Sequence, residues 1–326
     1  MTRPLAAMVL VVAAAGCRAE HFEGPPEAIT IAVSALPHAG IVQLAAAEGY
    51  FAREGLAVTL QPYAFGKQAL KALTTMKADI ATCAETPLVF ATLQGERIAV
   101  LATLASSTRA TAVLARKGSG IATAKDLAGK RIGLLHGTSA EFFLDTLLVR
   151  NEVDRRAVRI VETKQEDMLA ALQKGEVDAV TTWIPSLKSL QDSLGDKVIS
   201  FYAEDVYWET FNIASRSGFA QERPEAAKKL LRALLWAEAL FRDKPQEARR
   251  AVAAARKENP ADVGEMLAIF EFHVRLDQSL VVLMEEEARW AIHAGLAPKQ
   301  QMPNFLASIA AEPLLAVSPG AVGLIR

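Results

Sequence analysis

The sequence has few cysteines and no excess of charge of either sign. Its two cysteines, Cys17 and Cys83, are too few for a disulfide framework. Basic and acidic residues number 36 and 37, which gives the 326-residue chain a net charge of −1. We therefore expect no nucleic acid or other polyanion among its partners. The hydrophobic content of 51% is ample for two cores of ordinary size.

The sequence also lacks a hydrophobic run long enough to cross a bilayer at its N-terminus. Residues 5–15 are apolar and follow Arg3, a pattern typical of a signal peptide, so we expect export. The run ends in AAGC at 14–17, which resembles a bacterial lipobox with Ala14 in place of the usual leucine. We expect a signal peptide over 1–17 and a lipid on Cys17. The alternative is an ordinary signal peptide cleaved nearby.

A lipid on Cys17 would leave Cys83 alone, so no intramolecular disulfide is expected. Residues 18–27 are polar and rich in proline and glycine. This composition predicts a flexible tether between the lipid anchor and the folded body.

Two later stretches, 29–87 and 131–185, are loose copies of each other. Four pairs of equivalent positions hold the same residue: Val58 and Val158, Leu73 and Leu172, Asp79 and Asp178, and Pro87 and Pro185. A chain that builds one unit twice is expected to have two lobes and a cleft between them. Binding in that cleft is the first hypothesis to test.

Both copies alternate short β-branched runs with amphipathic segments, which predicts an α/β fold with mostly parallel sheets. The expected strands are 29–33, 57–60, 79–82, 98–104, 111–115, 131–135, 158–161, 179–182, 198–200 and 210–214. The expected helices are 39–48, 67–76, 87–93, 140–150, 166–174 and 185–194. After Arg223 we expect only helices, including 262–272 and 279–294, as a buttress of the first lobe.

This order inserts the second lobe into the first. We expect residues 28–112 and 208–326 in the first lobe and 118–203 in the second. The chain would cross between them near 112–118 and 201–208. Two crossing segments make a hinge that can close around a ligand.

Ligands of parallel α/β sheets bind beyond the carboxyl ends of the strands, where loops meet helix N-termini. The duplication places two such loops face to face. The first contains Leu36, Pro37 and His38, and the second contains His136, Gly137, Thr138, Ser139 and Ala140. The second loop suits an anion, because Gly137 permits close approach and the free amides of a helix N-terminus attract negative charge. Thr138 and Ser139 could instead only cap their helix.

Matching positions after the third strand of each copy hold Glu85-Thr86 and Thr182-Trp183. Trp183 could form a flat wall over the ligand, or it could be a core residue. Glu85 could attract a hydrogen-bond donor at the cleft mouth, or it could be solvated. Trp208 lies at the second crossing and either lines the cleft or packs in the hinge. His38 and His136 are too few ligands for a metal site, and we expect none.

Several motifs, taken in order, resemble one family. They are GYF at 49–51, EGL at 54–56, DIA at 79–81, DLAGKRIG at 126–133, GTS at 137–139, KGEVDA at 174–179 and PGAV at 319–322. This pattern is similar to that of the substrate-binding proteins of ABC importers. The nearest branch contains the nitrate, taurine, aliphatic-sulfonate and thiamine-precursor binders. The resemblance covers residue 29 to the C-terminus.

The resemblance implies a type II periplasmic-binding fold that closes on a ligand and delivers it to a membrane permease with its ATPase. It implies that the two loops, Glu85-Thr86 and Trp183 contact a small anionic or zwitterionic solute, such as a sulfonate or nitrate. We expect a monomer without a cofactor. The alternatives are a pyrimidine-type thiamine precursor as the ligand, a ligand-sensing lipoprotein, or an enzyme on the same fold. The last is disfavoured because the cysteine-rich iron-binding segment of the related fungal synthases is absent and no nucleophile–base pair is evident.

Overall fold

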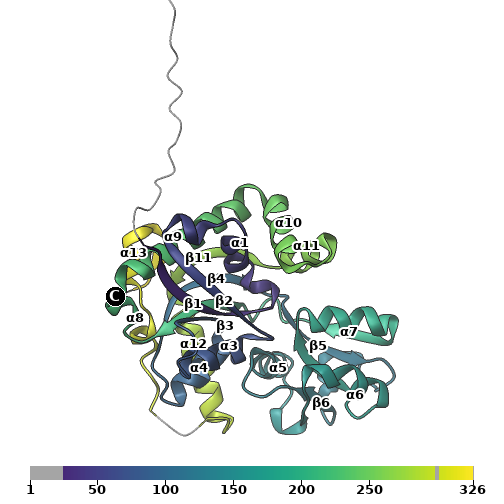
Figure 1. Ribbon diagram of the computed structural model, residues 1–326. Coiled ribbons are helices and arrows are strands. Elements are labelled where there is room, and N and C mark those ends of the chain that lie inside the picture. The colour runs from purple at the N-terminus through teal and green to yellow at the C-terminus, as the bar shows by residue number, and fades with distance from the viewer. Residues whose placement is uncertain (1–24, 298–300, 326) are drawn as a thin grey trace, which may run out of the picture.

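The computed structural model describes residues 25–297 and 301–325, and its strands form two separate sheets (Figure 1). The predicted signal peptide, Cys17 and most of the predicted tether lie outside the described residues. The larger sheet has the strand order β12-β11-β4-β10-β3-β1-β2. Its strands are β1 (Glu27–Ser34), β2 (Leu56–Tyr63), β3 (Ile80–Ala84), β4 (Ile98–Ser107), β10 (Glu209–Arg216), β11 (Glu271–Asp277) and β12 (Val322–Gly323).

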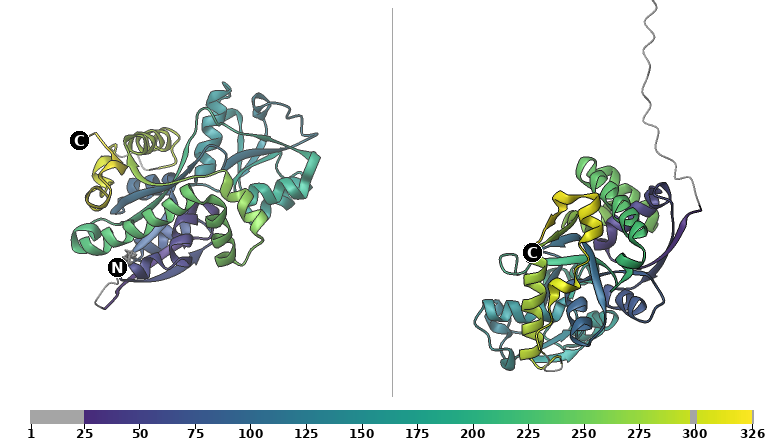
Figure 2. Two further views of the ribbon diagram at one scale, coloured as in Figure 1. Left: turned by 90° about the horizontal axis from the view of Figure 1, so that it is seen from above. Right: turned by 90° about the vertical axis from the view of Figure 1, so that its left-hand side faces the viewer.

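The smaller sheet has the strand order β7-β6-β8-β5-β9. Its strands are β5 (Thr111–Arg116), β6 (Arg131–Leu134), β7 (Arg159–Glu162), β8 (Ala179–Trp183) and β9 (Val198–Phe201). We call the larger sheet with its helices the first lobe and residues 111–201 the second lobe. The second lobe lies at one end of the molecule, and the C-terminal segment lies on the first lobe (Figure 2).

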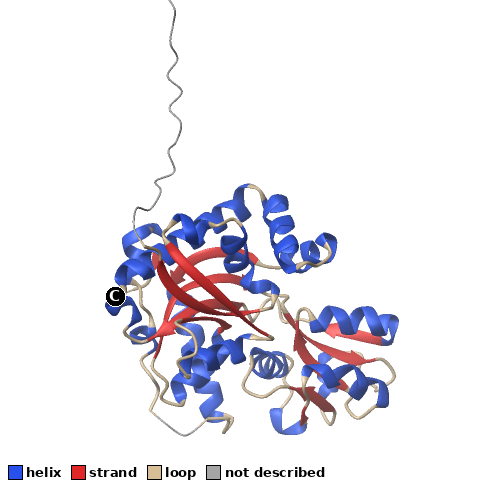
Figure 3. Ribbon diagram, in the orientation of Figure 1, coloured by secondary structure: helices blue, strands red, loops and turns tan. Residues whose placement is uncertain are grey.

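Helices cover both faces of each sheet (Figure 3). Those of the second lobe are α5 (Ser139–Arg150), α6 (Met168–Lys174) and α7 (Ser186–Leu194). Those of the first lobe are α1 (Gly40–Ala47), α2 (Tyr50–Arg53), α3 (Gly66–Thr74), α4 (Glu85–Leu93), α8 (Phe219–Glu222), α9 (Pro224–Asp243), α10 (Pro245–Arg256), α11 (Pro260–Ala268), α12 (Gln278–His293) and α13 (Glu312–Val317).

The elements follow the local patterns of the sequence. Helix α3 buries Ala69, Leu70 and Leu73 on one stripe and leaves Lys67 and Lys71 exposed, as an amphipathic helix on a sheet does. Strand β4 is buried at all ten positions because β10 and β11 flank it and helices cover both faces, so it is apolar along most of its length. Each lobe therefore encloses apolar clusters of its own.

The sheets locate the two crossings between the lobes. Strand β4 ends at Ser107 in the first sheet, and β5 begins at Thr111 inside the second. The first crossing is therefore 108–110, and the prediction that placed it near 112–118, and residues 111–112 in the first lobe, was wrong. Those residues are buried within a sheet, because β5 pairs with β8 and β9 on its two sides. The second crossing is 202–208, between β9 and β10.

The prediction that only helices follow Arg223 was also wrong. Residues 271–277 form strand β11, which pairs antiparallel with β4, and the short strand β12 pairs with β11. Val274 and Leu276 point into the core while their neighbours are more exposed, which is the two-residue period of a strand. The sequence therefore contained the signal, in a segment too short to separate from the helices on either side.

Candidate functional site

The strand-end loops of both lobes meet at a small cavity, which we call the inner pocket. It has a volume of about 30 Å³. Strands β1 and β2 of the first lobe and β6 and β8 of the second lead into it, as expected for the carboxyl ends of parallel strands. Strand β10 runs antiparallel to β3, so its first residues lie at the same edge. The residues used below are Leu36, His38, Phe65, Gly66, Lys67, Thr138, Ser139, Trp183, Glu209 and Phe211.

A larger groove of about 520 Å³ adjoins the inner pocket, and we call it the outer groove. Phe65, Lys67 and Pro87 line both spaces, so the two form one continuous cleft between the lobes. Lys71 of α3 and His136 of the second lobe also line the outer groove. The two lysines, Lys67 and Lys71, thus come from the α3 side of the groove, and residues of both lobes line it.

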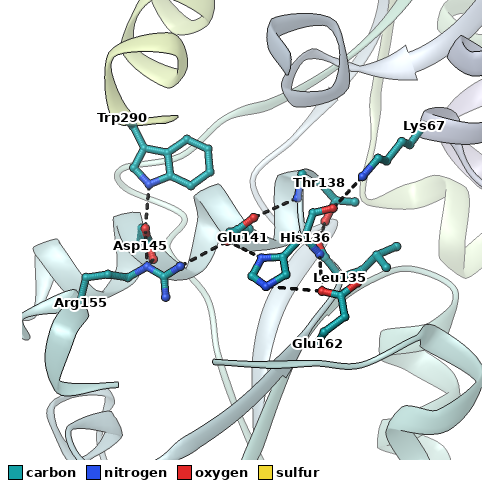
Figure 4. Close-up of polar contacts among 10 residues, drawn as sticks. Lys67, Leu135, His136, Thr138, Glu141, Asp145, Arg155, Glu162 and Trp290 are labelled. Atoms are coloured by element: carbon teal, nitrogen blue, oxygen red, sulfur yellow. Dashed lines mark hydrogen bonds and ion pairs between the residues drawn. The ribbon is translucent and has the colours of Figure 1, made fainter. Parts of the chain in front are cut away.

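Lys67 connects the two walls of the cleft. Its Nζ donates a hydrogen bond of 2.8 Å to the backbone carbonyl of His136, across from α3 to the loop before α5 (Figure 4). Gly137 permits this approach, because a Cβ atom there would lie 3.0 Å from the Lys67 Nζ and the backbone has φ of +66°. The ammonium group therefore sits where the lobes come together.

Two helix N-termini point into the same space. The N-cap of α5 is Thr138, whose hydroxyl donates to the carbonyl of Leu135 at 2.7 Å and not to the helix. The N-cap of α3 is Phe65, which has no side-chain cap either. The first amides of both helices therefore have no side-chain acceptor, and such amides bind anions. The alternative that Thr138 and Ser139 only cap α5 is not what the structure shows.

His38 and Trp183 form the apolar part of the inner pocket. The His38 ring stacks on Phe211 with centroids 4.2 Å apart and planes 12° apart, and Trp183 meets Phe65 edge-on. Both are more than nine-tenths buried, and the His38 Nε2 and Trp183 Nε1 atoms have no hydrogen-bond partner among the described residues. Burial, with a smaller contribution from Arg256, lowers the pKa of His38 to about 3, so the ring is neutral. Leu36 and Ala140 pack against Trp183.

Glu85 and Thr86 are not at the cleft mouth, and that prediction was wrong. Both are fully buried. The Glu85 carboxylate accepts hydrogen bonds from the Tyr207 hydroxyl and from the backbone amide and hydroxyl of Thr210. The Thr86 hydroxyl donates to Glu287 at 3.0 Å. These residues form a polar layer inside the first lobe, behind the inner pocket.

The remaining predicted residues lie as follows. His136 and Gly137 line the outer groove, and Thr138 and Ser139 line the inner pocket. Pro37 is buried in a short 3₁₀ turn, Pro37–Ala39. Trp208 is half exposed and lines a separate cavity of about 270 Å³ with His273 and Arg275, so the structure does not bring it to the cleft.

The prediction missed several residues that line the cleft, among them Phe65, Gly66, Lys67 and Glu209. The first three follow the second strand, whereas the prediction used only the loops after the first and third strands. Gly66 was the available signal, because a Cβ atom there would lie 2.7 Å from the Cα of Cys83. Glu209 had no such signal, because only the antiparallel return of β10 brings it to the cleft.

A polar network holds the second loop in position (Figure 4). Buried Glu141 accepts hydrogen bonds from the Gly137 amide at 2.9 Å and from Arg155 at 3.2 Å, and lies 2.7 Å from the His136 Nδ1. Arg155 also donates to Asp145 at 2.8 Å.

Asp145 in turn connects the second lobe to the first. It accepts a hydrogen bond of 2.7 Å from the Trp290 Nε1 of α12. The lobes are thus joined on both sides of α5, by Trp290 on one side and by Lys67 on the other.

The stability of the protein depends on pH through three buried glutamates, Glu209, Glu85 and Glu287. Burial, followed by the negative charge of Glu85, raises the pKa of Glu209 to about 8. Burial also raises the pKa of Glu85 and Glu287. An acid whose pKa is higher in the folded chain keeps its proton longer when folded, so the free energy of unfolding falls as pH rises toward that value.

We therefore expect the free energy of unfolding to fall by on the order of 2 kcal/mol between pH 6.5 and 8 through Glu209 alone, at about 1.4 kcal/mol per pH unit. His38 and His273, whose pKa values are lowered to about 3 and about 4, act in the opposite direction but only below their ordinary value of 6.5. Urea unfolding of wild type and Glu209→Gln across this range measures the effect. The variant should show a flatter slope, and equal slopes would contradict the assignment.

Within the part of the chain that the structure describes, no three His, Cys, Asp or Glu side chains are grouped so that they could hold a metal ion. No helix among the described residues has the length and apolar character needed to span a bilayer.

The comparisons with known proteins agree with this architecture. The family model described as "NMT1/THI5 like" matches residues 36–248, which is more than half of the chain. The chain belongs to the NMT1/THI5-like family. The family resemblance inferred from the motifs is therefore confirmed.

A curated relative is the taurine-binding periplasmic protein of Escherichia coli (strain K12). It is 25% identical over 206 residues, which cover 62% of this chain and 63% of that protein. The chain spans less than two thirds of the length of the curated relatives that it matches.

Two solved structures show the fold. The alkanesulfonate-binding protein SsuA from Xanthomonas axonopodis pv. citri, bound to MOPS, has a TM-score of 0.74 at 20% identity. The match covers 88% of this chain and 99% of that one. The desulfurization enzyme DSZB has a TM-score of 0.62 at 19% identity, over 90% and 99% of the two chains. The predicted periplasmic-binding-protein fold is thus confirmed, on a scaffold that also carries an enzyme.

Proposed function

We propose that the protein is the extracytoplasmic binding protein of an ABC importer, and that it captures a small anionic organic or inorganic solute in the cleft between its lobes. The observation that carries the proposal is the convergence of Lys67 and the uncapped N-termini of α3 and α5 on one space. A cation and free amides from both lobes attract an anion and gain contacts as the lobes close on it.

The solute names of the relatives support this class. The taurine-binding protein and the alkanesulfonate-binding structure both take sulfonates, according to their names. A sulfonate has three acceptor oxygens, which suit one ammonium group and several amides. Sulfonates are therefore the first candidates, ahead of nitrate and of pyrimidine-type solutes.

The chemistry of the site favours binding over catalysis. Cys83 is the free cysteine of the described residues, and it is fully buried. Burial, with the nearby charge of Glu85, also raises the pKa of its thiol, so it is not a nucleophile facing the cleft. We infer that the protein is not an enzyme.

The proposal includes the predicted location and partners. The N-terminal sequence supports export and a lipid on Cys17, and the family supports delivery to a membrane permease and its ATPase by a monomer that opens and closes about the crossings 108–110 and 202–208. Intact mass spectrometry of the exported protein measures whether its chain begins at a lipidated Cys17.

The test is a thermal-shift screen of protein from which any bound solute has been removed by unfolding and refolding. The set should contain alkanesulfonates, nitrate, bicarbonate, amino-pyrimidines and purines. We expect the sulfonates to raise the melting temperature, because a ligand that binds only the folded state stabilises it. Stabilisation by purines or pyrimidines alone would overturn the anion proposal, and stabilisation by none of the set would count against it.

A further inference from the structure

Three carboxyl groups lie together behind and beside the cleft without a cation. Glu209, Glu85 and Glu287 are each at most 2% exposed. Glu209 is hydrogen-bonded to the hydroxyls of Thr111, at 2.8 Å, and Ser139. Glu287 is hydrogen-bonded to Thr86 and to Glu85. Among the described residues, none of the three carboxyl groups has a basic side chain within ion-pair distance.

Such a cluster cannot be fully ionised. Neighbouring buried carboxylates repel each other, and burial disfavours each charge, so protons are retained. This is the physical reason why the pKa of Glu209 rises to about 8. At neutral pH the cluster therefore holds protons. A positively charged group of a bound solute could replace one of them.

Only Glu209 of the three lines the cleft. It forms part of the inner pocket, whereas Glu85 and Glu287 lie behind it. The inner pocket holds about 30 Å³, which is room for a group about the size of a water molecule. An ammonium group has this size. The rest of a solute would extend past Lys67 into the outer groove of about 520 Å³.

The groups along the cleft differ in charge. Glu209 lines only the inner pocket, Lys67 lines both spaces, and Lys71 lines only the outer groove, whose lining also includes Glu96 and the buried Glu141. The helix N-termini of α3 and α5 also line the inner pocket. A solute with a positive group at one end and a negative group at the other matches this arrangement.

We propose that Glu209 binds the ammonium group of a zwitterionic solute, and that the bound ammonium group replaces the proton of the Glu209 carboxyl group. The proton passes to the solvent, the carboxylate forms an ion pair with the intact R–NH₃⁺ group, and no covalent bond of the solute changes. This inference rests on the proposed function, because it assigns the second end of the same solute.

The groups that face Glu209 decide the pH range over which solute binding releases a proton. Tyr207 and His38 stay neutral near pH 7, because burial raises the pKa of the first well above its usual value and lowers that of the second to about 3. Glu209, whose pKa is raised to about 8, is therefore the group whose proton a bound solute would displace near neutral pH. The facing groups by element are Glu85 on α4, Tyr207 on the second crossing, His38 on the 3₁₀ turn, Lys67 on α3 and Glu287 on α12.

Calorimetric titration with a matched pair of probes tests the inference. Taurine and ethanesulfonate differ in the amine, and each is titrated into refolded, solute-free protein in two buffers of different ionisation enthalpy. We expect taurine to bind at least about 10-fold more tightly and to release about one proton. Its affinity should rise by up to about 10-fold per pH unit between pH 6 and 7.5, since each bound solute displaces one proton.

The variant Glu209→Gln separates this role from a structural one. It keeps the shape and hydrogen bonds of the side chain, and we expect it to bind the two probes within about threefold of each other with no proton release. Glu204→Gln removes an exposed acid of the second crossing, which is paired with Arg109, and should behave as wild type. Far-UV circular dichroism checks that both variants are folded. The number of protons released is measured on the wild-type protein, so that test does not depend on a variant.

Each outcome decides between the two proposals. Equal affinity for both probes, or taurine binding without proton release, would overturn the role of Glu209 and leave the anion site intact. Failure of both probes to bind would count against the anion site as well, and with it the proposed function.

Discussion

Replacing Lys67 by Met is expected to weaken binding of the stabilising solute by about 10- to 100-fold. Lys67 is the cation of the inner pocket, and its ammonium group bridges the lobes through the carbonyl of His136. A hydrogen bond to a charged group contributes about 1.5–3 kcal/mol, which corresponds to this loss. Because the side chain is exposed on α3, the free energy of unfolding should change little.

Lys71→Met is the matched control for this change. Lys71 lies one helical turn further along α3 and lines only the outer groove. Its replacement removes the same charge without removing the bond between the lobes, so we expect a loss of less than about fivefold. Isothermal titration of both variants measures the difference. Equal losses would mean that Lys67 acts only through the general charge of the groove.

Replacing Arg155 by Met is expected to lower the free energy of unfolding by about 3 kcal/mol. The guanidinium group lies between two buried carboxyl groups, those of Glu141 and Asp145. Without it, neither carboxyl group keeps an arginine or lysine partner within the described residues, and leaving buried charge uncompensated is costly. Urea unfolding measures this loss.

The neighbouring Arg156→Met variant provides the control. Arg156 pairs with Asp154 on the surface, where both side chains are largely exposed. Surface pairs contribute little, so the change should cost less than about 1 kcal/mol. If both variants lose the same stability, the network behind the His136 loop does not carry the stability assigned to it.

Much of the fold could be predicted because its signals are local. The alternation of short strands and amphipathic helices lies within each copy of the duplicated unit, and neighbouring residues decide it. Strand β11 shows the limit of this reasoning. Its pairing with β4 joins Phe272 to Ala105, far apart in the sequence, so its segment was assigned to a helix.

The candidate site could be predicted in part for the same reason. The loops that hold Leu36, His38 and Thr138 follow strands that were recognised, and the structure brings them together with Trp183. The role of Glu85 could not be predicted, because its partners Tyr207 and Thr210 are more than 100 residues away. Burial of a glutamate among such distant hydroxyls leaves no mark on its own segment.

The cleft between the lobes is the expected binding site of the solute. The most direct test is a crystal structure of the refolded protein grown with the most strongly stabilising solute of the screen. We expect the anionic group within hydrogen-bond distance of the Lys67 Nζ or of the first amides of α5. A solute seated instead in the cavity beside Trp208, or anywhere outside the cleft, would contradict the account.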